Sequence, residues 1–322
     1  MKVGEFVMIE AQINAALAAV EEKLVSAIES DVAVLADASR HIVTSGGKRL
    51  RPRLTLMAYL AAGGQTLETA LPLAAAIELV HTATLVHDDI NDHSLTRRGK
   101  LSVHARWGRT FALLTGDYLF SKVYELMAPF GNPCNEIMST ACVRLVEGET
   151  LQAAAAKTGE MNREVYKTII ERKTASLFEA GARMGAVVAG AEAEVVDALA
   201  EYARNVGMAF QIVDDILDVV GDAETLGKPT GLDATQGRGL AAVQNGRGGD
   251  QTHPTAVLEA EAEPDPLQAM FLRLRESGAL ELAHLQAVEL AERARAALQA
   301  VRPSPARDSL ERLIDDAINR QR

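Results

Sequence analysis

The chain has few of the features that mark a secreted, membrane-spanning or nucleic-acid-binding protein. Its two cysteines, Cys134 and Cys142, suit neither a disulfide framework nor a zinc site and fit a reducing compartment. No run of about 18 apolar residues is free of charge, and the first residues lack a signal-peptide pattern. The net charge is −11, and the chain has no basic stripe that could neutralise the phosphates of a nucleic acid. We expect a cytoplasmic protein with no transmembrane segment and no nucleic-acid partner.

Aromatic residues and alternating β-branched runs are also scarce, which argues against a sheet-based fold. Aromatics make up only 4% of the 322 residues. Ala and Leu instead recur at three- and four-residue spacing, which predicts helices over residues 11–28, 71–86, 192–220 and 280–301. Breakers at Ser45-Gly46-Gly47, Gly63-Gly64 and Gly131-Asn132-Pro133 are expected to separate helices. The composition therefore predicts an all-α fold.

Two aspartate clusters with the same spacing stand out against this background. Residues 88–92 read Asp-Asp-Ile-Asn-Asp, and residues 214–218 read Asp-Asp-Ile-Leu-Asp. On a helix, positions i and i+4 share a face, so each cluster would present a pair of carboxylates in an otherwise apolar segment. Such a pair is tolerated when cations neutralise it, and Mg²⁺ commonly completes its shell with substrate phosphates. One cluster alone could be a solvated acidic face; two, each followed by basic residues, favour a metal-diphosphate site.

At these residues the chain resembles the trans-polyprenyl (head-to-tail isoprenyl) diphosphate synthases. The similarity runs from about Gly46 to Asp233 and is carried by Gly46–Pro52, His81–Asp92, Arg97–Gly99, Arg172–Thr174 and Phe210–Asp218, the last continuing to Gly227-Lys228. The resemblance implies a single-domain isoprenoid synthase bundle over residues 1–322, with helices around a deep central cavity. It also implies a homodimer.

The resemblance further implies a prenyltransferase reaction. An allylic diphosphate ionises, the C=C of isopentenyl diphosphate attacks the cation, and loss of a proton gives a longer trans-polyprenyl diphosphate. Preorganised cations stabilise the departing diphosphate in such chemistry. By resemblance, about three Mg²⁺ ions per subunit would be held by Asp88 and Asp92 from one side and Asp214 from the other. The same resemblance places three further carboxylates nearby, namely those of Asp89, Asp215 and Asp218.

Two sets of polar residues match the diphosphate sites of that family. The isopentenyl diphosphate set is Lys48, Arg51, His81 and Arg98, and the allylic diphosphate set is Arg97, Lys173, Thr174, Gln211 and Lys228. The catalytic positions implied are Asp88, Asp92, Lys173, Thr174, Gln211 and Asp214. Arg grips phosphate oxygens bidentately and Lys acts as a point charge, so both sets suit the chemistry. Read alone, residues 47–51 could be an exposed basic turn, and Thr174 and Gln211 ordinary helix-packing residues.

Product length depends on the helix that precedes the first aspartate cluster. Helical spacing places Ile77 and Thr84 near the face of Asp88, with Val80 and Ala83 beside them. Short-chain members of the family carry a bulky residue four or five positions before the motif, where this chain has Thr84 and Ala83. We therefore expect a product of C20 or longer. Two alternatives stay open: this face packs against a neighbouring helix, or an aromatic floor comes from Tyr118, Phe120 or Tyr124.

Other functions are compatible with parts of the pattern. A class I terpene cyclase also uses an aspartate motif and Mg²⁺, but has no isopentenyl site. A short-chain farnesyl diphosphate synthase would keep every motif. An HD-type phosphohydrolase would need metal-binding histidines, and an inactive regulatory subunit would have lost aspartates. The chain departs from the family after Lys228, where Leu232 and Arg238 replace common lysines.

Overall fold

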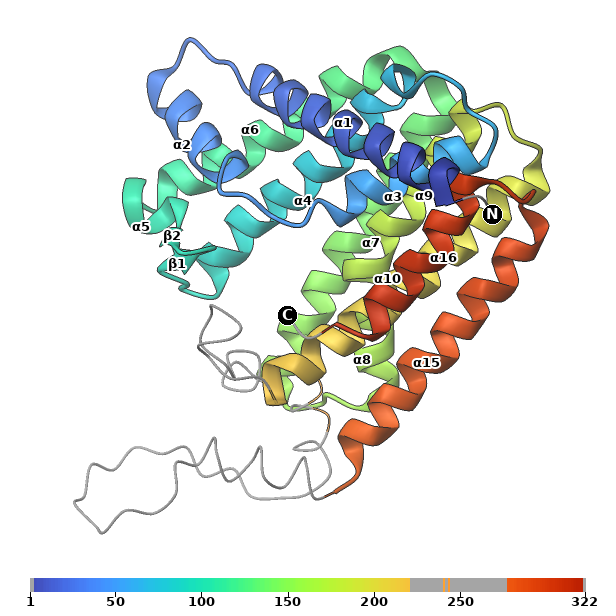
Figure 1. Ribbon diagram of the computed structural model, residues 1–322. Coiled ribbons are helices and arrows are strands. Elements are labelled where there is room, and N and C mark those ends of the chain that lie inside the picture. The colour runs from blue at the N-terminus through green and yellow to red at the C-terminus, as the bar shows by residue number, and fades with distance from the viewer. Residues whose placement is uncertain (1–2, 221–239, 241–242, 244–276, 321–322) are drawn as a thin grey trace.

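The protein is an assembly of helices, seen here in a computed structural model that describes residues 3–220, 240, 243 and 277–320 (Figure 1). The elements, in chain order, are α1 (Val3–Ala27), α2 (Ala33–Val43), α3 (Leu50–Ala61), η1 (Leu67–Thr69), α4 (Leu71–Asn91), β1 (Thr96–Arg97), β2 (Lys100–Leu101), α5 (Val103–Trp107), α6 (Arg109–Met127), η2 (Ala128–Phe130), α7 (Gly131–Thr158), α8 (Arg163–Ile170), the π-helical turn η3 (Glu171–Ala175), α9 (Ser176–Val188), α10 (Ala193–Val220), α15 (Ala279–Ala297), η4 (Leu298–Ala300) and α16 (Pro305–Ile318). Lys228 and the divergent segment after it, apart from residues 240 and 243, lie outside the described residues.

The predicted helices are confirmed, and the breakers separate elements as expected. The four periodic stretches coincide with α1, α4, α10, and α15 with η4. Gly63 has a φ of +103° just after α3, a conformation that side-chain-bearing residues rarely adopt. Gly131, with a φ of +69°, turns the chain from η2 directly into α7, so no loop separates these two elements. The all-α fold class is therefore confirmed.

A two-stranded hairpin is the one extended element in the described part of the chain. β1 and β2 pair antiparallel, with Arg97 opposite Lys100. Their connection is Arg98-Gly99, and both residues have positive φ, +51° and +75°. Two such residues are the requirement of a tight type I′ hairpin turn. Strands of two residues are too short to produce an alternating pattern, which is why the sequence did not predict them.

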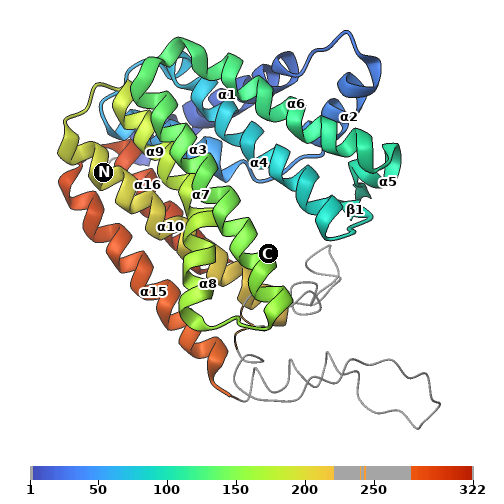
Figure 2. The same ribbon diagram turned by 180° about the vertical axis from the view of Figure 1, so that it is seen from behind.

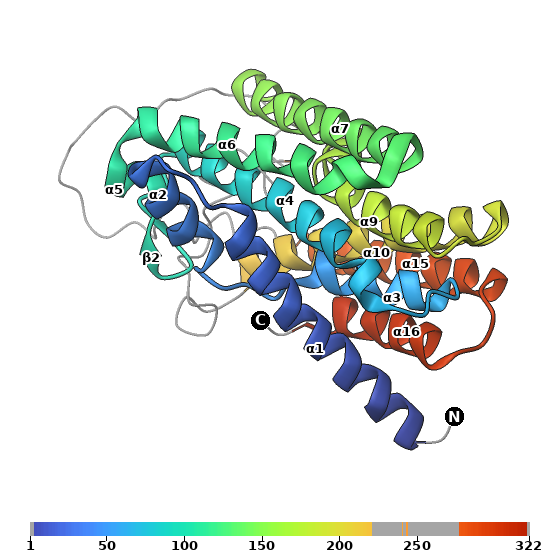
Figure 3. The same cartoon turned by 90° about the horizontal axis from the view of Figure 1, so that it is seen from above.

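The helices pack around separate hydrophobic clusters on the two sides of the molecule. One cluster joins α1, α2, α4, α6 and α7, and α1, α4 and α6 lie side by side when seen from above (Figure 3). Another joins α3, α9, α10, α15 and α16. Seen from behind, α7 and α8 lie on the side of α10 and α15 (Figure 2). α4 and α10, which carry the two aspartate clusters, therefore belong to different sides of the fold.

The alanine-rich α4 is buried on nearly every face. Leu73, Ala74, Ala75, Ala76 and Ile77 are all fully buried. A helix that is apolar all round is typical of the interior of a large helical protein. Small side chains let its neighbours approach closely, which suits a chain with so few aromatics. Within residues 3–220 and 277–320, no helix is both long and apolar enough to cross a membrane.

Candidate active site

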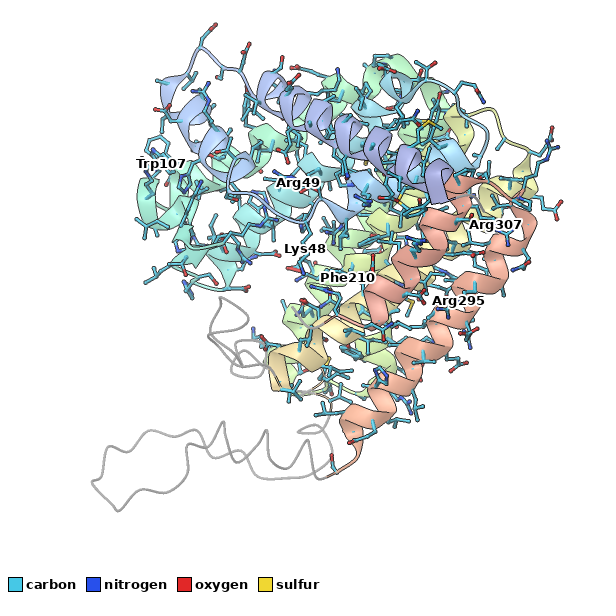
Figure 4. All side chains as sticks on the ribbon, in the orientation of Figure 1. Lys48, Arg49, Trp107, Phe210, Arg295 and Arg307 are labelled. Carbon is cyan, nitrogen blue, oxygen red and sulfur yellow. The ribbon has the colours of Figure 1, made fainter. Side chains whose placement is uncertain are left out.

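A cavity of about 560 Å³ lies where α3, α4, α7, η3, α9 and α10 converge. It is lined by both charged and apolar side chains. Figure 4 shows Lys48 and Phe210, two of its lining residues, near the centre of the ribbon. Most of the residues expected from the sequence line this one cavity, namely Lys48, Arg51, His81, Thr84, Asp88, Arg98, Lys173, Thr174, Gln211 and Asp214.

The first aspartate cluster ends α4 and divides its carboxylates between two directions. Asp88 lines the cavity, and its Oδ2 lies 3.8 Å from Lys173 Nζ. Asp89 is fully buried and accepts hydrogen bonds from Arg97 Nε at 2.9 Å and Nη2 at 2.5 Å. Asp92 is the residue that caps the end of the helix. Arg97 therefore contacts Asp89 and does not line the cavity, and its role toward the allylic diphosphate stays a prediction.

Negative charge is concentrated around Asp88. Burial raises the pKa of the Asp88 carboxyl to about 8; nearby Lys173 lowers it, while Glu149 and Asp92 raise it further. Lys173 Nζ is also 2.5 Å from Glu149 Oε2 and donates a hydrogen bond to Gln152 Oε1 at 2.9 Å. Burial is the largest cause of this raised pKa, and the neighbouring carboxylates add to it. These acidic side chains therefore fit the neighbourhood of a divalent cation.

Lys173 and Thr174 are carried by the π-helical turn η3, which separates α8 from α9. Such turns often occur at functional sites, because the extra residue redirects side chains. The Thr174 hydroxyl donates to Gln211 Oε1 at 3.0 Å, and Gln211 Nε2 donates to Asp215 Oδ1 at 2.8 Å. The Tyr166 hydroxyl donates to the other oxygen of Asp215 at 2.7 Å. Asp215 thus fixes the orientation of the polar groups that face the cavity.

In the second cluster, Asp214 alone lines the cavity. Its side chain is 38% exposed, and Oδ1 lies 3.5 Å from Arg320 Nη2. Asp215 and Asp218 are buried and do not line the cavity. Within the described residues, no three acidic, imidazole or thiol groups converge closely enough to hold an ion by themselves. The two carboxylates that line the cavity, those of Asp88 and Asp214, suit a divalent cation that also binds substrate oxygens.

The four residues expected to bind isopentenyl diphosphate line the same cavity on the side of α3 and the hairpin. Arg98 donates to the carbonyl of Gly46, and its guanidinium covers Gly47 so closely that a Cβ there would lie 2.9 Å from it. Gly47 also has a φ of +142°. Both observations explain why the loop before Lys48 contains adjacent glycines. The hairpin turn and this loop together hold Arg98 against the cavity.

Arg51 and His81 are half-buried and lie near other cations. Burial lowers the pKa of Arg51 to about 10, and the neighbouring Glu78 carboxylate opposes that shift. Burial, and then the charges of Arg51 and Arg98, hold the pKa of His81 well below 6.5, so the ring is neutral at neutral pH. Arg51 lies over the Phe178 ring, 4.8 Å from its centroid, and no acceptor in the described residues reaches its Nε. A pocket in which positive charge exceeds the nearby negative charge is suited to bind an anion.

Four charged residues that line the cavity were given no role from the sequence: Arg49, Glu78, Glu149 and Arg320. Glu78 precedes His81 by three positions on α4, so the helical spacing that linked His81 to Asp88 could have found it. Glu149 on α7 and Arg320 after α16 belong to no local motif. Glu149 and Arg320 reach the cavity because α7 and α16 pack against the other helices. Local sequence patterns do not encode that packing, so they give no signal for these two residues.

The residues expected to set chain length differ in their positions. Thr84 lines the cavity, whereas Ile77, Val80 and Ala83 are fully buried and do not line it. The apolar walls come from Leu85, Leu145 and Leu177. None of the three suggested aromatic residues lines the cavity, since Tyr118 donates to the carbonyl of Glu29, Phe120 stacks on His87, and Tyr124 is exposed. Because α4 is apolar all round, its spacing did not reveal which face meets the cavity.

Comparison with known proteins gives a consistent result. A family model described as Polyprenyl synthetase matches residues 32–254. An all-trans-nonaprenyl-diphosphate synthase (geranyl-diphosphate specific) of Rhodobacter capsulatus is 38% identical over 308 residues, 94% of each chain. A geranylgeranyl diphosphate synthase of Methanosarcina mazei is 35% identical over 291 residues, 88% of this chain and 89% of that one.

A solved structure agrees with these sequence relatives. The polyprenyl synthase from Caulobacter crescentus, complexed with calcium and isoprenyl diphosphate, aligns with a TM-score of 0.86 at 34% identity, covering 100% of this chain and 98% of the other. The fold, the aspartate clusters and these matches define a helical prenyltransferase. The chain belongs to the polyprenyl synthetase family.

Proposed function

We propose that the chain condenses isopentenyl diphosphate head-to-tail with an allylic diphosphate, releasing diphosphate and forming a trans-polyprenyl diphosphate of C20 or longer. One observation carries this proposal: a cationic group (Lys48, Arg51, Arg98) and two carboxylates from separate motifs (Asp88, Asp214) line a single cavity. A class I terpene cyclase would have no use for the cationic group. The whole of residues 1–322 is proposed to act as one polyprenyl synthetase domain.

In this proposal, the cationic group binds isopentenyl diphosphate without a metal ion. Arg51 and Arg98 supply forked N–H donors, and Lys48 adds a point charge. Neutral His81 donates a hydrogen bond from one ring nitrogen. The Arg51 Nε, which has no acceptor among the described residues, is directed to a phosphate oxygen. The C=C of the bound substrate then points down the cavity toward the allylic carbon.

The allylic diphosphate occupies the end of the cavity that holds the aspartates. Asp88, Asp92 and Asp214 would hold about three Mg²⁺ ions, with Asp89, Asp215 and Asp218 nearby. When bound, these ions stabilise the negative charge that develops on the leaving diphosphate. Lys173 supplies a further cation there, with Arg97 and Lys228 as additional proposed contacts. Thr174 and Gln211, oriented by Asp215, present fixed dipoles to the reacting centre, and the released diphosphate accepts the proton.

The growing chain is proposed to extend past Thr84 between Leu85, Leu145 and Leu177. Among the described residues that line the cavity, Phe210 on α10 is the one Phe, Tyr or Trp, and α4 contributes none. The relatives have names of both kinds: nonaprenyl and geranylgeranyl synthases make products longer than farnesyl by name, whereas two others are named short chain isoprenyl diphosphate synthases. The proposal of a C20 or longer product over farnesyl therefore rests on the small residues Ala83 and Thr84 before Asp88.

A homodimer is also proposed, through α6 and α7. Both helices expose large apolar side chains, namely Phe111, Leu113, Leu114, Tyr124, Val143 and Val146. Large exposed apolar side chains on neighbouring helices suit an interface with another protein surface, and two-fold homodimers are the commonest soluble oligomers. Light scattering on a size-exclusion column tests it. A dimer that Leu114→Glu converts to monomer is expected, whereas a wild-type monomer would refute it.

The proposed activity is tested by incubating the protein with isopentenyl diphosphate and either geranyl or farnesyl diphosphate, with and without Mg²⁺. Products are separated by chromatography, and released diphosphate is measured in parallel. We expect elongation that needs both substrates and Mg²⁺, with products of C20 or longer. Diphosphate release from the allylic substrate alone would indicate a cyclase, and products that stop at farnesyl would indicate a short-chain synthase.

A further inference from the structure

Glu78 is a buried carboxylate inside the proposed isopentenyl diphosphate site, where negative charge should oppose an anionic substrate. It lines the same cavity as Lys48, Arg51 and Arg98, and its side chain is only 3% exposed. A buried carboxylate is costly unless it is paired. Its partner is Arg49, whose Nη1 donates to Glu78 Oε1 at 2.6 Å.

Arg49 also lines this cavity, and its guanidinium is held by acceptors on α1, α2 and α4. Its Nη2 donates to the carbonyl of Val43 at 2.8 Å and to Glu21 Oε2 at 3.1 Å, and its Nε donates to the other oxygen of Glu21. Arg49 has a φ of +48°, a conformation that residues with side chains seldom adopt. Such a strained residue persists when its surroundings over-determine it. The ion triad Glu21–Arg49–Glu78 therefore joins α1, the loop before α3, and α4.

Glu78 also acts on the cations that face the cavity. Among the charged neighbours of Arg51 and of Arg98, Glu78 has the largest effect, and it raises the pKa of both groups against the lowering caused by burial. Arg98 lowers the pKa of Arg51 and Arg49 lowers that of Arg98, so these like charges disfavour one another, and the Glu78 carboxylate offsets that effect. When a diphosphate binds, its own charge takes over this role.

We propose that Arg49 and Glu78 are positioning residues of the isopentenyl diphosphate site. Glu78 is an internal counter-ion that keeps Arg51 and Arg98 together before substrate arrives, and Arg49 neutralises this carboxylate so that it does not repel the diphosphate. The inference rests on the proposed function for the identity of the diphosphate ligand.

The first test is calorimetric titration of isopentenyl diphosphate into the metal-free protein without allylic substrate. Arg49→Met, which keeps side-chain length but removes the charge, should raise Kd by roughly ten-fold or more, because Glu78 is left unpaired. The matched control is Arg53→Met, one turn later in α3. Arg53 also pairs with α1, through Glu10 and Asn14, but does not line the cavity. The Kd of the Arg53→Met variant for isopentenyl diphosphate should therefore stay within about three-fold of wild type.

The second test is rescue. Adding Glu78→Gln to Arg49→Met removes the unpaired charge, and Kd should return to within about three-fold of wild type. A double variant that binds as weakly as Arg49→Met would overturn the proposal, since Arg49 would then act only through the shape of the loop. The proposal would also be overturned if the single variant Arg49→Met bound isopentenyl diphosphate with the same Kd as wild type.

The third test uses Glu78→Gln alone and does not depend on Arg49 variants folding. Without the Glu78 carboxylate, the repulsion between Arg51 and Arg98 is larger, so a bound diphosphate stabilises the protein more by neutralising them. Isopentenyl diphosphate should therefore raise the melting temperature of Glu78→Gln by more than it raises that of wild type. An equal or smaller rise contradicts the counter-ion role. Repeating all three tests with inorganic diphosphate separates this inference from the proposed function, because the triad should act on any diphosphate, whether or not the wild-type protein elongates prenyl chains.

Discussion

Gly148 on α7 lies directly against Lys173 on η3: a Cβ at Gly148 would lie 2.6 Å from the Lys173 backbone nitrogen and 2.9 Å from Arg172 Cβ. The π-helical turn bulges toward α7, and only a glycine leaves space for it. The catalytic lysine proposed here therefore depends on a residue of a different helix that carries no functional group.

Gly148→Ala should displace η3 and Lys173 with it. Since misplacing a catalytic group by about 1 Å can cost about 10²-fold in rate, we expect kcat to fall by one to two orders of magnitude while the protein still folds. Steady-state kinetics and circular dichroism measure the two effects. Gly4→Ala on α1 is the matched control, since nothing lies within 4 Å of a Cβ at that position. Unchanged kcat in Gly148→Ala would show that η3 tolerates the shift.

Asp88→Ala and Asp214→Ala remove the two motif carboxylates that line the cavity. Loss of one electrostatic stabiliser commonly costs about 10²–10³-fold in rate, so each variant should lose at least that much turnover. Removing a carboxylate from the acidic group around Asp88 should not unfold the protein, because burial already disfavours its charge. Asp31→Ala, at an exposed site, serves as control. Near-normal turnover in Asp88→Ala would refute the metal-site assignment.

Introducing Phe at position 84 should change the length of the prenyl product, whereas introducing Phe at position 83 should change the stability of the protein. Thr84→Phe places a ring in the cavity below Asp88, so product should shorten to farnesyl or geranylgeranyl diphosphate with catalysis retained. Ala83 is fully buried between helices, so Ala83→Phe should instead destabilise the fold by about 1–3 kcal/mol through overpacking. Leu145→Ala should lengthen the product. Product chromatography and urea unfolding measure these outcomes; an unchanged product distribution in Thr84→Phe would mean the floor lies elsewhere.

His81 should make stability depend on pH. Its pKa is lowered in the folded protein and near 6.5 in the unfolded chain, so below pH 6.5 the unfolded chain binds the proton more readily. The free energy of unfolding should therefore fall as pH drops below 6.5, by up to about 1.4 kcal/mol per pH unit. Urea unfolding of ligand-free wild type and His81→Gln measures it. The variant should show the smaller slope, and equal slopes would mean that His81 does not titrate between the two states.

The sequence predicted those features that depend on local spacing. The helices, the two aspartate clusters and the basic loop around Lys48 each have a signature within about ten residues. Positions that depend on how helices pack had none. Glu149 reaches Asp88 only because α7 crosses η3, and Arg320 reaches Asp214 only because α16 ends beside α10. Spacing also indicated that Asp214 and Asp218 share a face, but only Asp214 lines the cavity, and Asp218 is buried.

The second aspartate of each cluster holds a neighbouring side chain in place: Asp89 accepts from Arg97, and Asp215 accepts from Gln211 and Tyr166. Kinetic data on these positions would consequently show strong epistasis. An Asp215→Ala variant should resemble Gln211→Ala, since the amide of Gln211 loses the acceptor that sets its orientation, and combining the two changes should add little to either alone. Loss of activity on substituting Asp215 would therefore not by itself identify a metal ligand, because the same loss follows from breaking its hydrogen bond with Gln211.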